Sequence, residues 1–305
     1  MGMPLADEYR YLDESIQERD DYSVRRIPTG VPDFDEIIRG GIPSGSVIIL
    51  LGEDGAGHLE YVYTSASKIQ IAKKYPKASE YFLGTTKFDF LPEKICYITF
   101  SRSRSSILRE IKATFNDDYY LVFRDHVLFK DFSSRYFKDT IVPQSWTSEA
   151  GSGSLFEGAP SDGGGENASI LEELVDFLDE NANGAMVVID SLTDLVVSEA
   201  IKLHDLITTL KGLKMAAKNW DGIVYLLLTQ GIMDPREQQM LVEGSDGLLV
   251  FEWSRYHNSS KRQRFMYVEK FTSILTHMER KRIAKFPIMI SARGGLVVSN
   301  LEMIS

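Results

Sequence analysis

Cysteine, histidine and long apolar runs are all scarce in this chain of 305 residues. Cys96 is the single cysteine, so no intramolecular disulfide can form and no cysteine cluster can bind a metal. The five histidines are scattered without the spacing of metal ligands. No apolar run reaches the roughly 18–20 residues that a membrane-spanning helix needs. These absences exclude a disulfide scaffold, a zinc motif and a membrane span as explanations of the sequence.

Positive charge is also in short supply. The chain has 34 Lys and Arg against 44 Asp and Glu, which gives a formal net charge of -10. Such a balance favours solubility and disfavours unaided binding to nucleic acid. The opening residues, "MGMPLADEYR", show no basic region followed by an apolar one, so no secretory signal is recognisable. We therefore expect a cytoplasmic protein without a membrane span.

Short apolar runs alternate with helical patterns from Arg26 onward, which predicts an α/β fold. The expected buried strands are 47–51, 95–100, 186–189 and 223–228, and the expected helices are 58–75, 105–115 and 204–220. Four later runs, 247–255, 262–271, 286–292 and 294–299, have the pattern of antiparallel strands. The sequence thus predicts a mostly parallel central sheet flanked by helices, with an antiparallel extension at one edge.

The domain prediction is a single unit over residues 25–300, preceded by a polar tail over 1–24. Within that unit, residues 143–168 are rich in Gly and Ser and are expected to form a flexible loop. No internal repeat divides the chain.

The segment "GEDGAGHLE" carries the frame of a phosphate-binding loop directly after the apolar run 47–51. Its candidate nucleotide-binding residues are Gly52, Glu53, Asp54, Gly55, Ala56, Gly57, His58 and Leu59. Glycines allow backbone N–H groups to curl around phosphates at the start of a helix, and a strand before and a helix after the loop are the required context.

Two side chains that such a loop needs are missing. His58 stands where lysine is expected, and Leu59 stands where a hydroxyl would help to hold magnesium. An ordinary surface histidine is mostly neutral at pH 7, so nucleotide affinity that depends on His58 should rise below about pH 6.5. The alternatives are a weak site, a vestigial site, or an ordinary turn with His58 at the surface.

The segment "RIPTGVPDFDEIIRGGIPSGSVIILLGEDGAGHLE" resembles the opening of KaiC-like domains in the RecA superfamily of P-loop ATPases. The matching residues are Thr29, Gly30, Phe34, Asp35, Gly40, Gly41, Ile42, Pro43 and Gly45. The resemblance implies a RecA-like P-loop fold. It also identifies "AMVVIDSLTDL" as similar to the Walker B strand, with Asp190 and Ser191 at its end. Asp190 would then be the magnesium residue if Mg²⁺ is bound, with a turn cap as the alternative.

Two further positions depart from the family pattern. The resemblance implies a glutamate pair after "YITF", where this chain has Ser101 and Arg102. It also implies a Lys-x-Arg that reaches a neighbouring subunit's nucleotide. This chain keeps Lys270 as a possible trans contact but has Thr272 in place of the arginine. ATP and Mg²⁺ are therefore expected as weakened ligands, and no catalytic residue is assigned.

The sequence favours a degenerate, regulatory or scaffolding ATPase relative of the archaeal single-domain type, a pseudo-ATPase in signal transduction. The alternative is residual Mg-dependent ATPase activity, with recombinase-like DNA association as a variant. Partners would be proteins or further copies in a hexameric ring, and nucleic acid is not expected. The basic segments 102–112 and 280–285 are interpreted as solvated surface.

Overall fold

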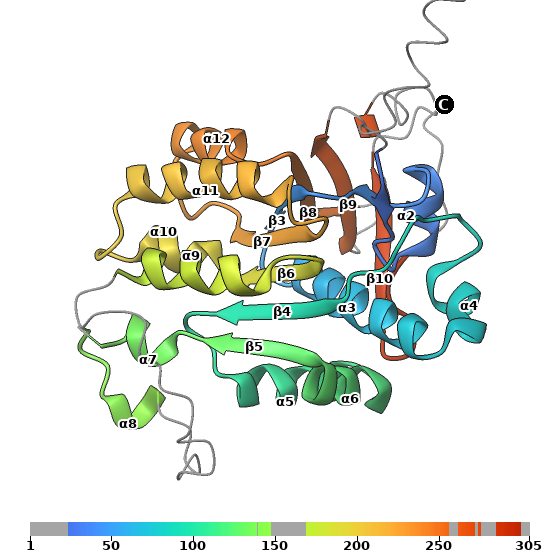
Figure 1. The fold of residues 1–305 in the computed structure, drawn as a ribbon, viewed down its shortest axis with the longest axis horizontal. Coiled ribbons are helices and arrows are strands. Elements are labelled where there is room, and N and C mark those ends of the chain that lie inside the picture. Colours follow the sequence, from blue (N-terminus) through green and yellow to red (C-terminus); the bar gives the residue numbers. More distant parts are fainter. Residues whose placement is uncertain are drawn as a thin grey trace, which may run out of the picture.

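A computed structural model describes residues 24–138, 140–147, 169–255, 262–271, 274–275 and 285–299. Within these residues, nine strands form one twisted sheet in the order β11-β10-β9-β8-β3-β7-β6-β4-β5 (Figure 1). The strands are β3 (Ser46–Gly52), β4 (Lys94–Thr99), β5 (Val127–Asp131), β6 (Ala185–Asp190), β7 (Ile223–Thr229), β8 (Gly247–Arg255), β9 (Arg262–Lys270), β10 (Phe286–Ser291) and β11 (Gly295–Val298). The α/β fold class is confirmed.

The strands from β8 to β5 are mutually parallel, whereas β9, β10 and β11 are antiparallel. The antiparallel extension was predicted to begin at residue 247, and this start is wrong. β8 pairs in parallel with β3 and in antiparallel fashion with β9, so the change of direction falls between β8 and β9. Each strand direction depends on the connection before it, which the local apolar pattern does not encode.

Helices cover both faces of the sheet because the central strands are apolar on both sides (Figure 1). Ile48 and Leu50 of β3 pack on one face with α2 (Pro32–Ile37), α3 (His58–Lys74), α5 (Arg104–Thr114) and α6 (Asp117–His126). Val47 and Ile49 pack on the opposite face with α9 (Ile170–Asn181), α11 (Leu203–Ala217) and α12 (Pro235–Glu243). Successive residues of β3 thus anchor two separate apolar layers.

The remaining elements are short. They are β1 (Arg26–Ile27) paired with β2 (Ile42–Pro43), the 3-10 turn η2 (Pro76–Ala78), α4 (Ser79–Leu83), α7 (Ser133–Tyr136), α8 (Gln144–Thr147) and α10 (Leu192–Val197). The predicted tail 1–24 and the predicted flexible loop 143–168 fall mostly outside the described residues, although α8 lies at the start of the latter. None of the described helices is both long and apolar enough to cross a lipid bilayer.

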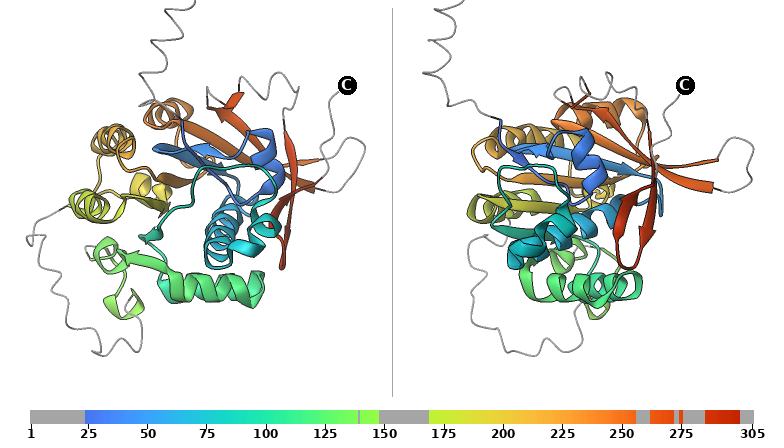
Figure 2. Two further views of the ribbon diagram at one scale, coloured as in Figure 1. Left: turned by 45° about the vertical axis from the view of Figure 1, so that its right-hand side comes forward. Right: turned by 90° about the vertical axis from the view of Figure 1, so that its right-hand side faces the viewer.

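The β10–β11 hairpin forms one edge of the sheet and lies beside α2 and α3 (Figure 2). The backbone N–H of Leu296 donates to Thr64 Oγ1 of α3 at 2.8 Å. The last strands of the described chain therefore contact the helix that follows the candidate phosphate loop.

Candidate functional site

The candidate phosphate loop, Gly52–Leu59, joins the carboxyl end of β3 to the start of α3. Gly55 and Gly57 have φ angles of 68° and 117°, in the left-handed region that favours glycine. Gly57 is the N-cap residue of α3, a helix of 17 residues. A Cβ at Gly55 would meet nothing within 4 Å. The backbone thus retains glycine conformations at the start of a long helix, as an anion-binding loop requires.

Neighbouring strands hold this loop through its carbonyl groups. Gln230 N donates to the carbonyl of Gly52 at 2.9 Å, and Arg264 Nε donates to that of Gly55 at 2.7 Å. Trp253 Nε1 donates to the carbonyl of Asp54 at 3.1 Å. Sequence reasoning did not identify Trp253 or Arg264, because both lie about 200 residues downstream, in β8 and β9. These contacts fix the loop from the side of β7, β8 and β9.

His58 folds back against the loop and is not at the surface as expected. Its Nδ1 atom is buried without a hydrogen-bond partner, and its ring centroid lies 6.3 Å from that of Phe251. A Cβ at position 52 would lie 2.0 Å from Nδ1, so the ring fills the space beside Gly52. Burial lowers the pKa of His58 from 6.5 to about 4, although Asp54 acts in the opposite direction. The expected rise in affinity below pH 6.5 therefore moves down to near pH 4.

The side chain of Leu59 also points inward. It is partly buried and packs against the apolar layer that includes α3. Asp54, in contrast, is exposed at the tip of the loop. The first turn of α3 consequently offers a partly buried, neutral ring and a hydrocarbon at the two positions where a phosphate loop needs a cation and a hydroxyl.

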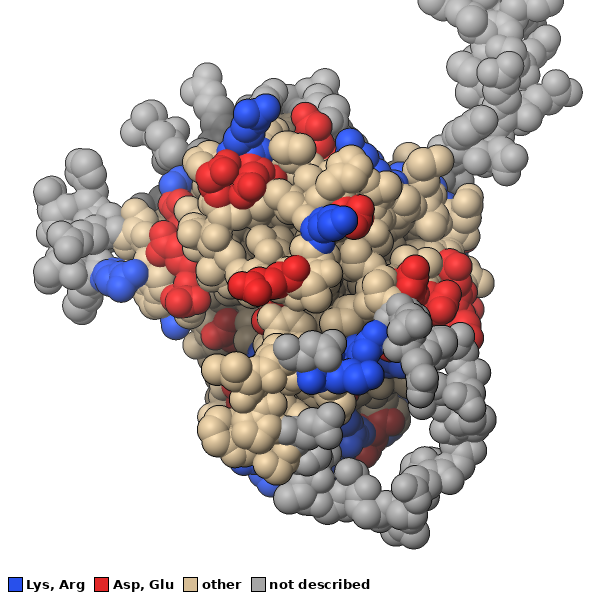
Figure 3. All heavy atoms as spheres, turned by 90° about the vertical axis from the view of Figure 1, so that its left-hand side faces the viewer, with Lys and Arg blue, Asp and Glu red and all other residues tan. Residues whose placement is uncertain are grey.

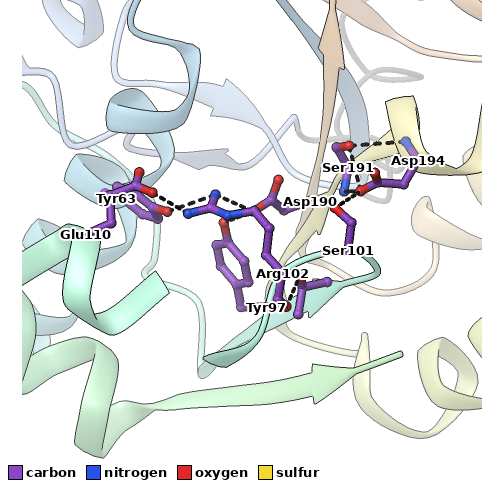
Figure 4. Close-up of polar contacts among 9 residues, drawn as sticks. Tyr63, Tyr97, Ser101, Arg102, Glu110, Asp190, Ser191 and Asp194 are labelled. Carbon is purple, nitrogen blue, oxygen red and sulfur yellow. Dashed lines mark hydrogen bonds and ion pairs between the residues drawn. The ribbon is translucent and has the colours of Figure 1, made fainter. Parts of the chain in front are cut away.

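Asp190 lies at the carboxyl end of β6, two strands away from β3 across β7. Its side chain is only 7% exposed. Asp190 Oδ2 accepts a hydrogen bond from the Tyr97 hydroxyl at 2.6 Å and forms an ion pair with Arg102 Nη1 at 3.1 Å (Figure 4). Burial raises the pKa of Asp190, and the Arg102 guanidinium and the Tyr97 hydroxyl act in the opposite direction.

Arg102 links Asp190 to α5. Its Nη2 forms an ion pair with Glu110, and its Nη1 lies 3.4 Å from the Tyr63 hydroxyl (Figure 4). We call Tyr63, Tyr97, Arg102, Glu110 and Asp190 the Asp190 network. The sequence singled out Arg102 as a departure from the glutamate that the resemblance implies and as the start of the basic segment 102–112; the interpretation of that segment as solvated surface is wrong for Arg102, which pairs with Asp190. The sequence contains no signal that this side chain reaches an aspartate 88 residues away.

Magnesium does not fit the residues present beside Asp190. Mg²⁺ requires oxygen ligands in a near-octahedral shell, whereas a guanidinium and a phenol hydroxyl both donate to Asp190 Oδ2. The hydroxyl expected at position 59 is absent, since that residue is Leu59. Among the residues that the structure describes, no group of three or more His, Cys, Asp or Glu side chains could hold a metal ion.

Ser191 caps a helix. Its Oγ accepts from the backbone N–H of Asp194 at 3.2 Å and donates to Asp194 Oδ2 at 3.0 Å, in the capping box of α10. Ser101 Oγ donates to the same Asp194 oxygen at 3.0 Å. The cap predicted as the alternative for this corner is therefore formed by Ser191, and Asp190 points instead into the network.

Lys270 lies at the end of β9, away from Asp190. Its Nζ donates to the carbonyls of Val242 and Ser245 at 2.5 and 2.8 Å, at the carboxyl end of α12. Burial lowers the pKa of Lys270, and nearby Lys214 lowers it further. Thr272 and residues 280–284 of the second basic segment lie outside the described residues. The trans contact of Lys270 stays a prediction.

The first basic segment is divided between inward and outward contacts. Arg102 enters the Asp190 network, whereas Arg104 donates to the carbonyl of Arg124 at 2.7 Å and lies over the Phe129 ring. The face of the molecule in Figure 3 carries acidic and basic groups side by side among uncharged residues.

Two known proteins match segments of this chain in sequence. Over 88 residues the chain is 34% identical to the circadian clock oscillator protein KaiC of Prochlorococcus marinus, which covers 28% of this chain and 14% of that protein. Over 34 residues it is 53% identical to a UPF0273 protein of Pyrococcus furiosus, which covers 11% of this chain and 14% of that relative. The matched segments thus span about one seventh of each curated relative. No family model matches the chain.

Two solved structures share the fold over most of its length. A KaiC-like protein of Pyrococcus horikoshii aligns with a TM-score of 0.55 and 18% identity, and covers 91% of this chain and 100% of its own. The flagellar accessory protein FlaH of Methanocaldococcus jannaschii aligns with a TM-score of 0.57 and 12% identity, with the same coverage. The chain is thus locally similar in sequence to KaiC and to a UPF0273 protein, and over most of its length it shares the fold of a KaiC-like protein and of FlaH.

Proposed function

We propose that this chain acts by binding, as a regulatory or scaffolding member of its family, without hydrolysing a nucleoside triphosphate. The observation that carries this proposal is the position of His58. It stands where the family has lysine, yet its partly buried ring lies against Gly52 and is neutral at pH 7, because burial lowers its pKa to about 4. Hydrolysis of phosphate anhydrides depends mainly on positioned charge. A loop without its cation provides little of that stabilisation.

The glycine backbone favours retention of some anion binding over complete loss. Gly55 and Gly57 keep left-handed conformations, and α3 directs its N-terminal N–H groups toward the loop. We therefore propose ATP as the ligand class to test first, bound more weakly than in a loop with lysine. This same observation supports the second candidate, residual Mg-dependent ATPase activity, and the test below separates the two.

The test measures thermal stability and phosphate release with ATP, with and without Mg²⁺. A ligand present at about 100 times its dissociation constant should add about 2.7 kcal/mol to the free energy of unfolding. Stabilisation without phosphate release supports the proposal. Release at about 1 s⁻¹ or faster, lost in Asp190→Asn, would establish the ATPase alternative.

A matched variant restores the missing loop side chains. The double substitution His58→Lys, Leu59→Thr should strengthen ATP binding, because it supplies the cation and the hydroxyl of a phosphate loop. It should not start phosphate release, since Ser101 and Arg102 still stand where the family has glutamates. Rapid release by this variant would show that the loop alone controls activity.

Two further proposals concern organisation. We propose that residues 25–300 act as one domain and that its partners are proteins, including further copies of itself. A six-membered ring with a trans contact from Lys270 would have to break two hydrogen bonds that this side chain makes within its own chain. Light scattering with and without ATP measures the assembly directly.

A further inference from the structure

We propose that Arg102 is a built-in replacement for a divalent cation at Asp190, and that it excludes such cations from this end of the sheet. This proposal adds to the proposed function and rests on it in one respect, namely that ATP is the ligand of the neighbouring loop. It concerns side chains of this chain alone, and it begins from the misfit between magnesium and the Asp190 network.

Arg102 is held in place from three directions. Its backbone carbonyl accepts from Thr99 Oγ1 at 2.8 Å, which anchors the residue at the end of β4. Its Nη1 pairs with Asp190 at 3.1 Å, and its Nη2 pairs with Glu110 on α5. A planar guanidinium can bridge two carboxylates in this way, whereas an ammonium group acts as a point charge.

Most of the Arg102–Asp190 pair is withdrawn from solvent. Arg102 is 23% exposed and Asp190 is 7% exposed. The Tyr97 hydroxyl donates to Asp190, and burial together with Asp190 holds the pKa of Tyr97 well above its usual range, so the hydroxyl stays a donor. The charge of the aspartate is thus balanced inside the protein.

A divalent cation beside Asp190 would meet the Arg102 guanidinium at short range, in a buried site where repulsion is weakly screened. Removal of Arg102 reverses this situation. Asp190 and Glu110 contact opposite ends of the same guanidinium, so both carboxylates would face the vacated space. Two carboxylates with room for water ligands are suited to Mg²⁺ or Mn²⁺.

The experiment uses Mn²⁺ alone, titrated into the full chain at about pH 8 and followed by the electron paramagnetic resonance of free Mn²⁺; at that pH an ordinary carboxylate is ionised. Arg102→Gln should bind Mn²⁺ about tenfold or more tighter than the wild type, and this gain should disappear in Arg102→Gln, Asp190→Asn. Arg102→Lys keeps the positive charge and should remain closed to the metal. Arg104→Gln removes a charge two residues away that does not touch Asp190, and should match the wild type.

Several outcomes would overturn the proposal. Mn²⁺ binding by the wild type that is lost in Asp190→Asn would show that Arg102 does not exclude the cation. Equal Mn²⁺ binding by wild type and Arg102→Gln would show that Arg102 is not the barrier. If circular dichroism shows that Arg102→Gln does not fold, Arg102→Met, which keeps much of the apolar stem, repeats the measurement, and the wild-type comparison with Asp190→Asn still decides. Because no nucleotide is used, the result is independent of whether the loop binds or hydrolyses one.

Discussion

The candidate phosphate loop follows β3 and the Asp190 network lies at the end of β6, so both are at the carboxyl ends of parallel strands, with β7 between them. The two regions differ in which features of a nucleotide site they retain. The loop keeps glycine conformations but holds a neutral, partly buried His58. The network keeps its carboxylate but pairs it with Arg102. The loop thus has the backbone of an anion-binding site without its cation, and in the network the aspartate is paired with an arginine of the same chain. Two neighbouring positions thus differ in how their charge is balanced.

The largest expected effect tests whether the network is structural. Asp190→Ala leaves the Arg102 guanidinium and the Tyr97 hydroxyl without their common acceptor, and should lower the free energy of unfolding by about 3 kcal/mol. Glu110→Ala removes the other partner of Arg102, but Glu110 is 42% exposed, so the loss should stay below about 1 kcal/mol. Urea unfolding measures both. Equal losses would mean that burial does not distinguish the two ends of the guanidinium.

The next effect sharpens the loop's side of the comparison through pH. Burial lowers the pKa of His58 from 6.5 to about 4, so its contribution to stability is fully present above pH 6.5 and is lost as pH falls through about 4. Between pH 7 and pH 4.5 the wild type should lose about 2 kcal/mol more than His58→Gln, which cannot take up this proton. Parallel pH profiles of the two proteins would show that His58 is not buried as described.

A smaller effect separates the two loop glycines. Gly57→Ala should destabilise the fold by about 1 kcal/mol more than Gly55→Ala. Both positions have positive φ, but a Cβ at Gly57 would lie 3.2 Å from Ile288 and 3.4 Å from Leu296, whereas a Cβ at Gly55 has open space. Thermal unfolding of the two variants measures this difference. The reverse order would contradict the packing of the β10–β11 hairpin on the loop.

The smallest effect concerns Lys270, outside both regions. Lys270→Met removes the hydrogen bonds to the carbonyls of Val242 and Ser245 and should cost about 1 kcal/mol. Its molecular mass in solution should equal that of the wild type if the side chain serves only its own chain. A change in mass with unchanged stability would support the trans contact instead.

The sequence predicted the central strands well because each is a short, continuous apolar run that is buried on both faces, as in β3 and β7. It did not predict β5, an edge strand in which Leu128 is 43% exposed, because the apolar signal of a half-solvated strand is weak. Tyr97 and Phe100 of the predicted strand 95–100 are buried, as a central strand requires.

The sequence predicted which positions belong to the candidate site, but not where their side chains point. Spacing located Gly55 and Gly57, because a phosphate loop has a local pattern, whereas the resemblance to a family's Walker B strand pointed to Asp190. The inward turn of His58 depends on space beside Gly52 and on Phe251, nearly 200 residues downstream. The reach of Arg102 depends on how β4 lies against β6. Such contacts arise from packing, which a single sequence does not display.

The hairpin on α3 has a consequence for the order in which the molecule is completed. Ile288, Ile290 and Leu296 surround the point where a side chain at Gly57 would stand, and Leu296 is bonded to Thr64. As a ribosome releases residues in order, the glycine turn emerges long before the strands that support it. The glycine turn can therefore reach its final conformation only after β10 and β11 have been synthesised. A truncated chain that ends before Phe286 would contain the turn without the strands that support it.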